Sequence, residues 1–471
     1  MSELLDVIII GAGTAGLTAL RAVKKHTERF VIVNDGPYGT TCARVGCMPS
    51  KVLIEAANAF HRRHTLEAFG IRGSAALTAD IPAVLRRVRE LRDSFVAFTL
   101  KATDQLGDRN IAGRARLLGP NRVEVNGQEL TAKRIIIATG SRPIVPPPWR
   151  ALGDRVLTTD TLFEQENLAP RIAVVGMGPI GIEVAQALSR LGIEIIGFSA
   201  GQHLAGLTDP TINETLFEQL KQEFVIHRGS KAELFEDADG IRVSNGKTRV
   251  VADQVIAALG RQPNLDGLGL EHLGVTLDTH GMPPINLRTM QIADLPIYLA
   301  GDANGKVPLL HEASDEGYIA GINALAEAPA HFVRRTPLGI VFVEPNIAFV
   351  GKRYEELDPD TSITGTVSFD DQGRARAAQR NAGLMHLYAD KRTGELLGAE
   401  MCVPAGEHMA HLLALAIGRQ LTVNDLLRMP FYHPVLEEGL RTALRDLANQ
   451  LPDAKKPDLD LCNVDCAAAG D

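Results

Sequence analysis

Two cysteines stand close together within residues 39–51, GTTCARVGCMPSK. They are Cys42 and Cys47, and the 471-residue chain has five cysteines in all. In a regular helix, residues five apart are separated by about 7.5 Å along the axis, whereas the Cα atoms of a disulfide usually lie about 4.4–6.8 Å apart. The two thiols can therefore bond to each other only where the chain bends, and Gly39 and Gly46 permit such a bend.

This cysteine pair is compatible with redox, metal-binding or structural chemistry. A thiol reacts as its thiolate, which nearby cations favour, and Arg44 and Lys51 are close in the sequence. A zinc site would need a second Cys/His pair at a matching spacing, and we find none in the sequence. A structural disulfide is disfavoured because few cysteines and an N-terminus unlike a signal peptide predict a reducing compartment, the cytoplasm. We therefore favour a redox-active pair over the two alternatives.

A glycine-rich loop lies upstream of the cysteines. The apolar run Leu5–Ile10 leads into Gly11, Gly13 and Gly16, an Ala/Leu-rich segment follows, and Phe30–Val33 is a second apolar run. A strand, a GxGxxG loop, a helix and a second strand form the βαβ unit that binds dinucleotides. The pyrophosphate of the ligand would lie at the N-terminus of the helix.

The same arrangement occurs a second time. The apolar run Ile172–Val175 leads into Gly176, Gly178 and Gly181, and Ile182–Leu191 is expected to form the helix. A single GxGxxG is a weak signal, but two loops in the same setting indicate two bound dinucleotides. The alternative is a pair of coincidental glycine turns.

Further apolar runs also end in turns. The run of residues 135–138 is followed by Thr139 and Gly140, and the run 255–259 is followed by Gly260. Asp302 stands two residues after the run 297–300. A carboxylate at the carboxyl end of a strand suits a hydrogen bond to a sugar hydroxyl. A simple Asx turn is the alternative interpretation of Asp302.

Length and charge narrow the class of protein. A chain of 471 residues is expected to contain about three domains. The net charge of −8 gives no support for a nucleic-acid partner. Spanning a membrane needs about 18 consecutive apolar residues, and we find no such run, so no membrane partner is expected.

The motifs together resemble the pyridine nucleotide–disulfide oxidoreductases, which use FAD and a nicotinamide nucleotide. The matching segments are the two GxGxxG loops, CARVGCMPSK at 42–51, ATG at 138–140, GRQPN at 260–264, LAGD at 299–302 and HPVLEE at 433–438. The resemblance extends to about residue 451. It implies an α/β fold with two Rossmann-like dinucleotide-binding domains and a C-terminal α+β dimerisation domain.

The resemblance also implies domain bounds. FAD would bind residues 1–148 together with 271–335, and NAD(P) would bind residues 149–270. Residues 336–451 would form the dimerisation domain, followed by a loose tail, 452–471. The implied cofactor-binding residues are Gly11, Gly13, Gly16, Asn34, Lys51, Ala115, Thr139, Gly140, Asp302, Leu310, Gly176, Gly178, Gly181, Ser199 and Gly260, and no residue is expected to bind a metal.

Catalytic roles follow from the same resemblance. Cys47 would lie beside the flavin, and Cys42 would exchange with the thiol substrate. Lys51 would lie near the reactive nitrogen of the flavin, paired with Glu183. In a homodimer, His433 would act as a base in the active site of the other subunit, and Glu438 would orient it.

Within the family the chain is most similar to bacterial dihydrolipoyl dehydrogenases. This similarity implies oxidation of a lipoyl-bearing protein of a 2-oxo-acid dehydrogenase or glycine-cleavage complex, with NAD as acceptor. Four features depart from the family pattern: Asn34, Ser199, Ala43-Arg44 in the active-site loop, and Tyr432 directly before His433. Asn34 and Ser199 stand where an acid usually binds a ribose, so NADP is not excluded.

Two alternatives stay open. The chain could be an NADPH-dependent reductase of a disulfide or mercuric ion, with Cys462 and Cys466 in the tail as an electron relay. Alternatively it could be a non-catalytic flavoprotein subunit, although such a subunit would not need both Cys47 and His433.

Overall fold

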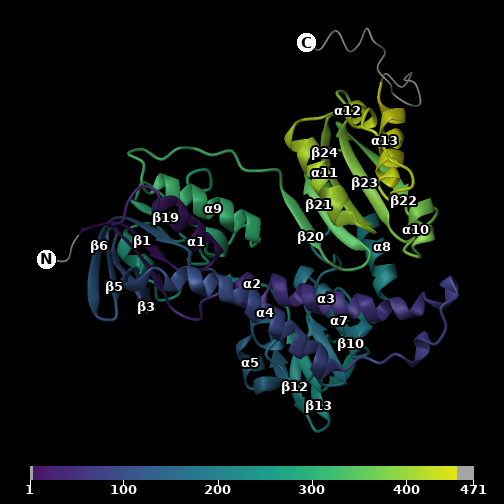
Figure 1. Ribbon diagram of the computed structural model, residues 1–471, viewed down its shortest axis with the longest axis horizontal. Helices are drawn as coiled ribbons and strands as arrows, with labels where there is room; N and C mark the ends of the chain where they lie inside the picture. Colours follow the sequence, from purple (N-terminus) through teal and green to yellow (C-terminus); the bar gives the residue numbers. More distant parts are fainter. Residues whose placement is uncertain (1–3, 453–471) are drawn as a thin grey trace.

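The computed structural model describes residues 4–452 of the chain. Figure 1 shows three bodies, each built around its own sheet: the first around β1, the second around β10 and the third around β23. The long helices α3 (Cys47–His61) and α4 (Ile81–Asp104) run between the first and the second body. The predicted tail cysteines, Cys462 and Cys466, lie outside the described residues.

The first body contains the first glycine loop. Its sheet has the strand order β17-β18-β19-β6-β1-β2-β3, and β5 pairs with β6 and β4. The bounds are β1 Leu5–Ile10, β2 Phe30–Asn34, β3 Asn110–Ala112, β4 Ala115–Gly119, β5 Arg122–Val125, β6 Gln128–Ile137, β17 Ile285–Asn286, β18 Gln291–Ile292 and β19 Ile297–Leu299. Strands β19, β6, β1, β2 and β3 are parallel. Their apolar residues are buried because two helices cover one face of the sheet, and strands β4 and β5 with residues 265–273 cover the other.

Two helices on this sheet come from distant parts of the chain. Helix α1 (Thr14–Val23) follows the glycine loop, and α9 (Leu310–Asn323) follows the loop that contains Asp302. They meet at Gly317, where an added Cβ would collide with the carbonyl oxygen of Ala15. This close contact brings Asp302 to the same edge of the sheet as the first glycine loop.

The second body repeats this design around the second glycine loop. Its parallel sheet has the order β11-β10-β9-β15-β8. The bounds are β8 Val156–Leu157, β9 Arg171–Val175, β10 Glu194–Phe198, β11 Val225–His227 and β15 Gln254–Ala257, with helices α5 Pro147–Arg150, α6 Thr159–Leu162, α7 Pro179–Arg190 and α8 Pro210–Leu220. An antiparallel meander is added, of β12 Glu233–Asp237, β13 Gly240–Ser244 and β14 Arg249–Ala252.

A two-stranded ribbon joins the first two bodies. It pairs β7 (Ser141–Pro143) with β16 (Arg261–Pro263) in antiparallel register. Each strand follows one of the predicted glycine turns, at Gly140 and Gly260. The ribbon therefore holds the carboxyl edges of the two parallel sheets toward each other.

The third body is an antiparallel sheet of order β20-β21-β24-β23-β22. Its bounds are β20 Leu338–Val341, β21 Asn346–Gly351, β22 Ser362–Ser368, β23 Leu384–Asp390 and β24 Leu396–Val403, with helices α10 Gly373–Ala377, α11 Gly406–Gly418, α12 Val423–Leu427 and α13 Glu438–Gln450. The sequence pattern predicts the last helix from Val435, but it begins at Glu438, because the Glu438 carboxylate accepts the Val435 N–H from outside the helix.

Buried polar contacts join the second and third bodies. Asp209, which is 1% exposed, caps α8 by accepting the N–H of Thr211 and Ile212. Its other oxygen accepts from His386 Nδ1 at 2.6 Å and from the Tyr388 hydroxyl at 2.8 Å. Because a buried carboxylate is costly unless its oxygens are satisfied, these contacts hold α8 against the third sheet.

No helix among residues 4–452 is long and apolar enough to cross a membrane.

Candidate functional site

The chain bends between the two cysteines, as their spacing requires. Helix α2 (Thr41–Val45) ends before Gly46, and α3 begins at Cys47. An added Cβ on Gly46 would lie 3.1 Å from the Thr41 carbonyl oxygen, a contact closer than most side chains accept. Thr40 has a positive φ of 60°, and its hydroxyl accepts the Ala43 N–H at 3.2 Å. A strained turn and a glycine therefore bring the two thiols together.

The Cys42 and Cys47 side chains lie within hydrogen-bonding distance of each other. A hydrogen bond from the Cys42 thiol and the positive charge of Lys51 together lower the pKa of Cys47 to about 7. The same hydrogen bond, together with burial, raises the pKa of Cys42 well above its ordinary value. The proton therefore stays on Cys42, and Cys47 is the thiolate near neutral pH.

Lys51 forms an ion pair that joins all three bodies. Its ammonium lies 3.0 and 2.8 Å from the two carboxylate oxygens of Glu183, on helix α7 of the second body. Oε1 of Glu183 also accepts the N–H of Phe342, which follows strand β20 of the third body, at 2.8 Å. The Lys51 ammonium lies 4.4 Å from the centre of the Phe342 ring. The structure thus brings Lys51 and Glu183 together beside the thiols.

A cavity of about 500 Å³ opens onto the thiols. Its lining includes eight of the predicted residues: Gly13, Cys42, Cys47, Lys51, Gly140, Glu183, Asp302 and Leu310. It also includes residues that the sequence analysis did not select, among them Arg261, His311, Phe342 and His411. His311 is next to Leu310, but His411 comes from α11 of the third body and no local motif marks it.

A second cavity, of about 410 Å³, continues along the first glycine loop. Its lining includes the predicted residues Gly11, Asn34, Ala115 and Thr139, and also Asp35. The Thr139 hydroxyl is buried and has no hydrogen-bond partner among residues 4–452. A buried polar atom without a partner is costly, so this hydroxyl fits a polar group of a bound ligand.

The glycine loop itself fits a pyrophosphate. Gly11 has a φ of +112°, and an added Cβ there would collide with the Ala138 carbonyl oxygen. An added Cβ on Gly16 would collide with the carbonyl oxygen of Gly11, so the loop is packed tightly on its inner side. Gly13 has open space on its outer side, where a phosphate can approach the N-terminus of α1. The residues present therefore fit a dinucleotide such as FAD.

Asn34 has a structural task in this site. Its side-chain oxygen accepts the N–H of Ala12, in the glycine loop, at 3.0 Å, and its side-chain nitrogen donates to the Gly36 carbonyl at 2.9 Å. Asn34 therefore braces the loop, while the adjacent carboxylate of Asp35 lines the same cavity. Asp35 follows Asn34 directly in the sequence but was not among the predicted binding residues.

Asp302 is held by residues of the two-stranded ribbon. Its carboxylate accepts the Ser141 hydroxyl at 2.7 Å. Arg261 donates to the Ser141 hydroxyl at 2.8 Å and to the Ser141 carbonyl at 2.7 Å. This chain of contacts fixes the orientation of Asp302, and it links residues that are 120 and 161 positions apart.

The second glycine loop has the geometry of the first. Added Cβ atoms on Gly176 and Gly181 would collide with the carbonyl oxygens of Ala258 and Gly176, whereas Gly178 has open space. The loop therefore also fits a pyrophosphate. Ser199 follows β10 and is 6% exposed. Its N–H donates to the His227 carbonyl at 2.8 Å, so it lies at the carboxyl edge of the second sheet, to which Gly260 also belongs.

His433 and Glu438 form a pair away from the thiols. His433 Nδ1 lies 3.1 and 3.2 Å from the two carboxylate oxygens of Glu438, and the His433 side chain is 80% exposed. The hydrogen bond with His433 lowers the pKa of Glu438. Neither residue lines the thiol cavity of its own chain within the described part of the structure. A single chain therefore does not bring His433 to Cys42.

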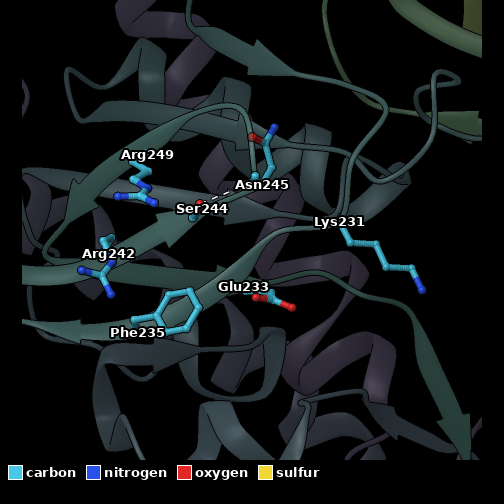
Figure 2. A pocket seen from close by; sticks show the side chains of 8 residues that line it. Lys231, Glu233, Phe235, Arg242, Ser244, Asn245 and Arg249 are labelled. Atoms are coloured by element: carbon cyan, nitrogen blue, oxygen red, sulfur yellow. Dashed lines mark hydrogen bonds between the residues drawn. The ribbon is translucent and has the colours of Figure 1, made fainter.

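Another hollow, of about 400 Å³, lies on the meander β12–β14. Figure 2 shows Lys231, Arg242 and Arg249 around it, with Glu233 and Phe235 below them. It contains none of the predicted site residues. Among residues 4–452, no three His, Cys, Asp or Glu side chains are grouped so that they could hold a metal ion.

Two protein-family models match the chain. The model described as pyridine nucleotide-disulphide oxidoreductase matches residues 5–317, and the model described as the dimerisation domain of that family matches residues 338–444. The family resemblance seen in the motifs and the expected α/β fold are both confirmed.

Similar proteins carry more than one activity. A dihydrolipoyl dehydrogenase from Thermus scotoductus is 32% identical over 94% of this chain and 98% of its own length. A dihydrolipoyl dehydrogenase from Chlamydia pneumoniae is 29% identical, over 93% and 96% of the two chains. A mercuric reductase from Lysinibacillus sphaericus is also 29% identical, over 93% of this chain and 82% of its own.

Solved structures share the fold over nearly the whole chain. The HOCl-induced flavoprotein disulfide reductase RclA from Escherichia coli, in its Cu(II) complex, has a TM-score of 0.82 at 21% identity, covering 94% of this chain and 99% of its own. LpdA from Mycobacterium tuberculosis has a TM-score of 0.81 at 25% identity, with the same coverage.

The pKa of Cys47 leads to a prediction about its reactivity. Because the folded-state pKa is depressed to about 7, the thiolate is present above pH 7 and is lost as the pH falls through that value. The alkylation rate of the reduced protein by iodoacetamide, followed at Cys47 by mass spectrometry, should therefore rise with a midpoint near pH 7. Lys51→Met should move this midpoint upward. A midpoint near that of an ordinary cysteine in the unsubstituted protein would contradict the assignment of Cys47 as the thiolate.

The unpartnered hydroxyl of Thr139 leads to a second prediction. Thr139→Val keeps the shape of the side chain but removes a hydrogen bond to the bound cofactor, which is worth about 1 kcal/mol. The dissociation constant of FAD, measured by fluorescence, should rise roughly 5- to 10-fold, whereas the stability of the FAD-free protein should not fall. Thr215→Val, whose hydroxyl only contacts its own helix, is the control. Unchanged FAD affinity in Thr139→Val would show that the hydroxyl does not face the cofactor.

Proposed function

The chain belongs to the pyridine nucleotide-disulphide oxidoreductase family, and we propose that it oxidises the dihydrolipoyl group of a lipoyl-bearing protein through Cys42 and Cys47, with NAD as acceptor. The single observation that carries this proposal is a pair of adjacent thiols whose pKa values are shifted in opposite directions. The pair lies beside Lys51 and Glu183, in a cavity that begins at a dinucleotide loop. Dihydrolipoyl dehydrogenases at 29–32% identity over almost the full chain support it.

The proposed exchange uses the two thiols in different roles. In the oxidised protein a substrate thiolate attacks the sulfur of Cys42 in a Cys42–Cys47 disulfide, and Cys47 leaves as a thiolate. The second substrate thiol then attacks the mixed disulfide, so the substrate leaves as a cyclic disulfide and Cys42 is released as a thiol. Lys51 stabilises the Cys47 thiolate by its charge. The glycine loop, Thr139 and Asp302 would hold FAD, which when bound would supply two-electron transfer between the dithiol and the nicotinamide.

We propose that the protein acts as a homodimer. The His433–Glu438 pair is exposed and lies apart from the thiols of its own chain, and the third body matches a family model described as a dimerisation domain. His433 of the partner subunit would take the proton of the substrate thiol with Nε2, because its Nδ1 faces the Glu438 carboxylate.

The nicotinamide nucleotide is proposed to lie along the second glycine loop, with Gly176, Gly178, Gly181, Ser199 and Gly260 as its binding residues. Ser199 offers neither a carboxylate for a ribose hydroxyl nor a cation for a 2′-phosphate. NAD follows from the dihydrolipoyl dehydrogenase assignment, and NADP is the alternative.

A second candidate is an NADPH-dependent reductase of a disulfide or mercuric ion. It is favoured by the mercuric reductase that matches at 29% identity. In that case the cysteines of the tail, Cys462 and Cys466, would carry electrons outward, but these residues lie outside the described part of the structure.

A turnover panel separates the two candidates. The FAD-loaded protein is assayed with dihydrolipoamide and NAD or NADP, and in the reverse direction with NADPH and oxidised glutathione, thioredoxin or mercuric ion. We expect the highest kcat/KM for dihydrolipoamide with NAD. Mercuric or disulfide reduction that exceeds it, and that is lost on truncation after Leu451, would replace the first candidate by the second.

The dimeric active site leads to a mutational prediction. His433→Ala should lower dithiol oxidation by about 10²–10⁴-fold, the usual contribution of general acid–base catalysis, and flavin reduction by NADH should change far less. His272→Ala removes another exposed histidine beside a glutamate and should leave both rates unchanged. Mixed dimers of His433→Ala and Cys42→Ser subunits should regain activity, because one of their two sites is intact. Full activity of a monomer would contradict the shared site.

A further inference from the structure

A row of polar side chains runs along one face of helix α7. It consists of Glu183, Gln186 and Arg190, and we call it the α7 polar row. Residues at these spacings lie on the same side of a helix. All three are buried, with exposed fractions of 7%, 3% and 6%. Buried polar groups need partners, and the row finds them in the segment Phe342–Glu344, between strands β20 and β21.

The Gln186 side chain both donates a hydrogen bond to the main chain of this segment and accepts one from it. Its side-chain nitrogen donates to the Glu344 carbonyl at 2.8 Å, and its side-chain oxygen accepts the Glu344 N–H at 2.9 Å. The same nitrogen also donates to Oε1 of Glu223 at 2.9 Å. An amide side chain that pairs with both main-chain groups of one residue fixes the position and the orientation of that residue.

Arg190 anchors the other end of the row. Its guanidinium donates to Glu223 at 2.7 and 2.8 Å, to Glu344 Oε2 at 3.2 Å and to the Asn58 side chain, on α3, at 2.6 Å. Glu223 therefore holds Gln186 and Arg190 together, and Asn58 links the row to the helix that carries Cys47 and Lys51. Every element that meets at the ion pair is thus also joined to this row.

We propose that Gln186 is a positioning residue for the Lys51–Glu183 pair. It clamps Glu344, and through Glu344 it fixes Phe342 two residues earlier. The Phe342 N–H holds one oxygen of Glu183, and the Phe342 ring lies beside the Lys51 ammonium. The place of the lysine charge relative to Cys47 therefore depends on a side chain one helical turn away that touches neither thiol.

This inference rests on the redox role of the thiols and not on the identity of their substrate. Loss of the clamp would leave the Glu344 carbonyl with only the longer hydrogen bond from Arg190, at 3.3 Å, among the described residues. Phe342 would then be held less firmly, and its two contacts with the Lys51–Glu183 pair would weaken. The lysine charge would then stabilise the Cys47 thiolate less, and the pair would be less well placed for exchange of electrons with a bound flavin. A purely structural role for Gln186 would lower stability without either effect.

The test uses the FAD-loaded protein with Gln186→Met, which keeps the length of the side chain but removes its two hydrogen bonds to Glu344 and the one to Glu223. The midpoint of Cys47 alkylation should rise by about half a pH unit or more, and single-turnover reduction of the flavin by NADH, or by NADPH if that is the coenzyme, should slow about tenfold. Ser189→Ala is the matched control, because Ser189 lies on the same helix and bonds only to the Glu223 carbonyl. It should change neither quantity.

An unchanged midpoint and an unchanged rate in Gln186→Met would overturn the proposal, whatever the melting temperature does. If that variant does not fold, Phe342→Leu keeps the main-chain N–H and removes only the ring, and it should raise the alkylation midpoint in the same direction. An unchanged midpoint in Phe342→Leu would also overturn it. Neither experiment uses a dithiol substrate, so a negative result with dihydrolipoamide would count against the proposed function and not against the role of Gln186.

Discussion

The ion pair between Lys51 and Glu183 is the contact on which the arrangement of this site depends. Lys51 lies one helical turn after Cys47 on α3, and Glu183 projects from a helix of the second body. A half-buried charge pair is stable only when its remaining groups are also satisfied, and here the Phe342 N–H of the third body completes it. One pair of charges thus connects a thiol, a nucleotide-binding body and the C-terminal sheet.

That constraint explains why two similar cysteines behave differently. They are five positions apart and share one hydrogen bond. Cys47 begins the 15-residue helix α3, which also carries Lys51, whereas Cys42 lies in the short helix α2. Helix N-termini and cations favour a thiolate, so the negative charge settles on Cys47 and the proton stays on Cys42. The fold therefore assigns the two roles that a dithiol exchange needs, and no metal ion or additional base is required for that assignment.

Local sequence was sufficient for the parts of the site that lie on one segment. The two glycine loops, the bend at Gly46 and the Lys51-bearing helix all follow from the spacing of neighbouring residues. The family resemblance added Glu183, His433 and Glu438 to the predicted catalytic residues. Phe342, Gln186 and Arg261 were not found, because each acts through a partner more than 100 positions away. The sequence pattern predicts the start of α13 three residues too early, because the Glu438 carboxylate accepts the Val435 N–H from outside the helix. The roles of His433 and Ser199 stay predictions.

The most direct measurement of the central claim is an anaerobic titration of the oxidised, FAD-loaded protein with dihydrolipoamide, followed by absorption spectroscopy and by a count of free thiols. The account predicts that one equivalent of dithiol is oxidised to its cyclic disulfide and opens a Cys42–Cys47 disulfide. Each chain then gains two protein thiols, counted after the small molecule is removed, and a long-wavelength band from the Cys47 thiolate beside the flavin appears. This band should be absent in Cys47→Ser. A flavin that is bleached with no new thiols, or a disulfide that dihydrolipoamide does not open, would contradict it.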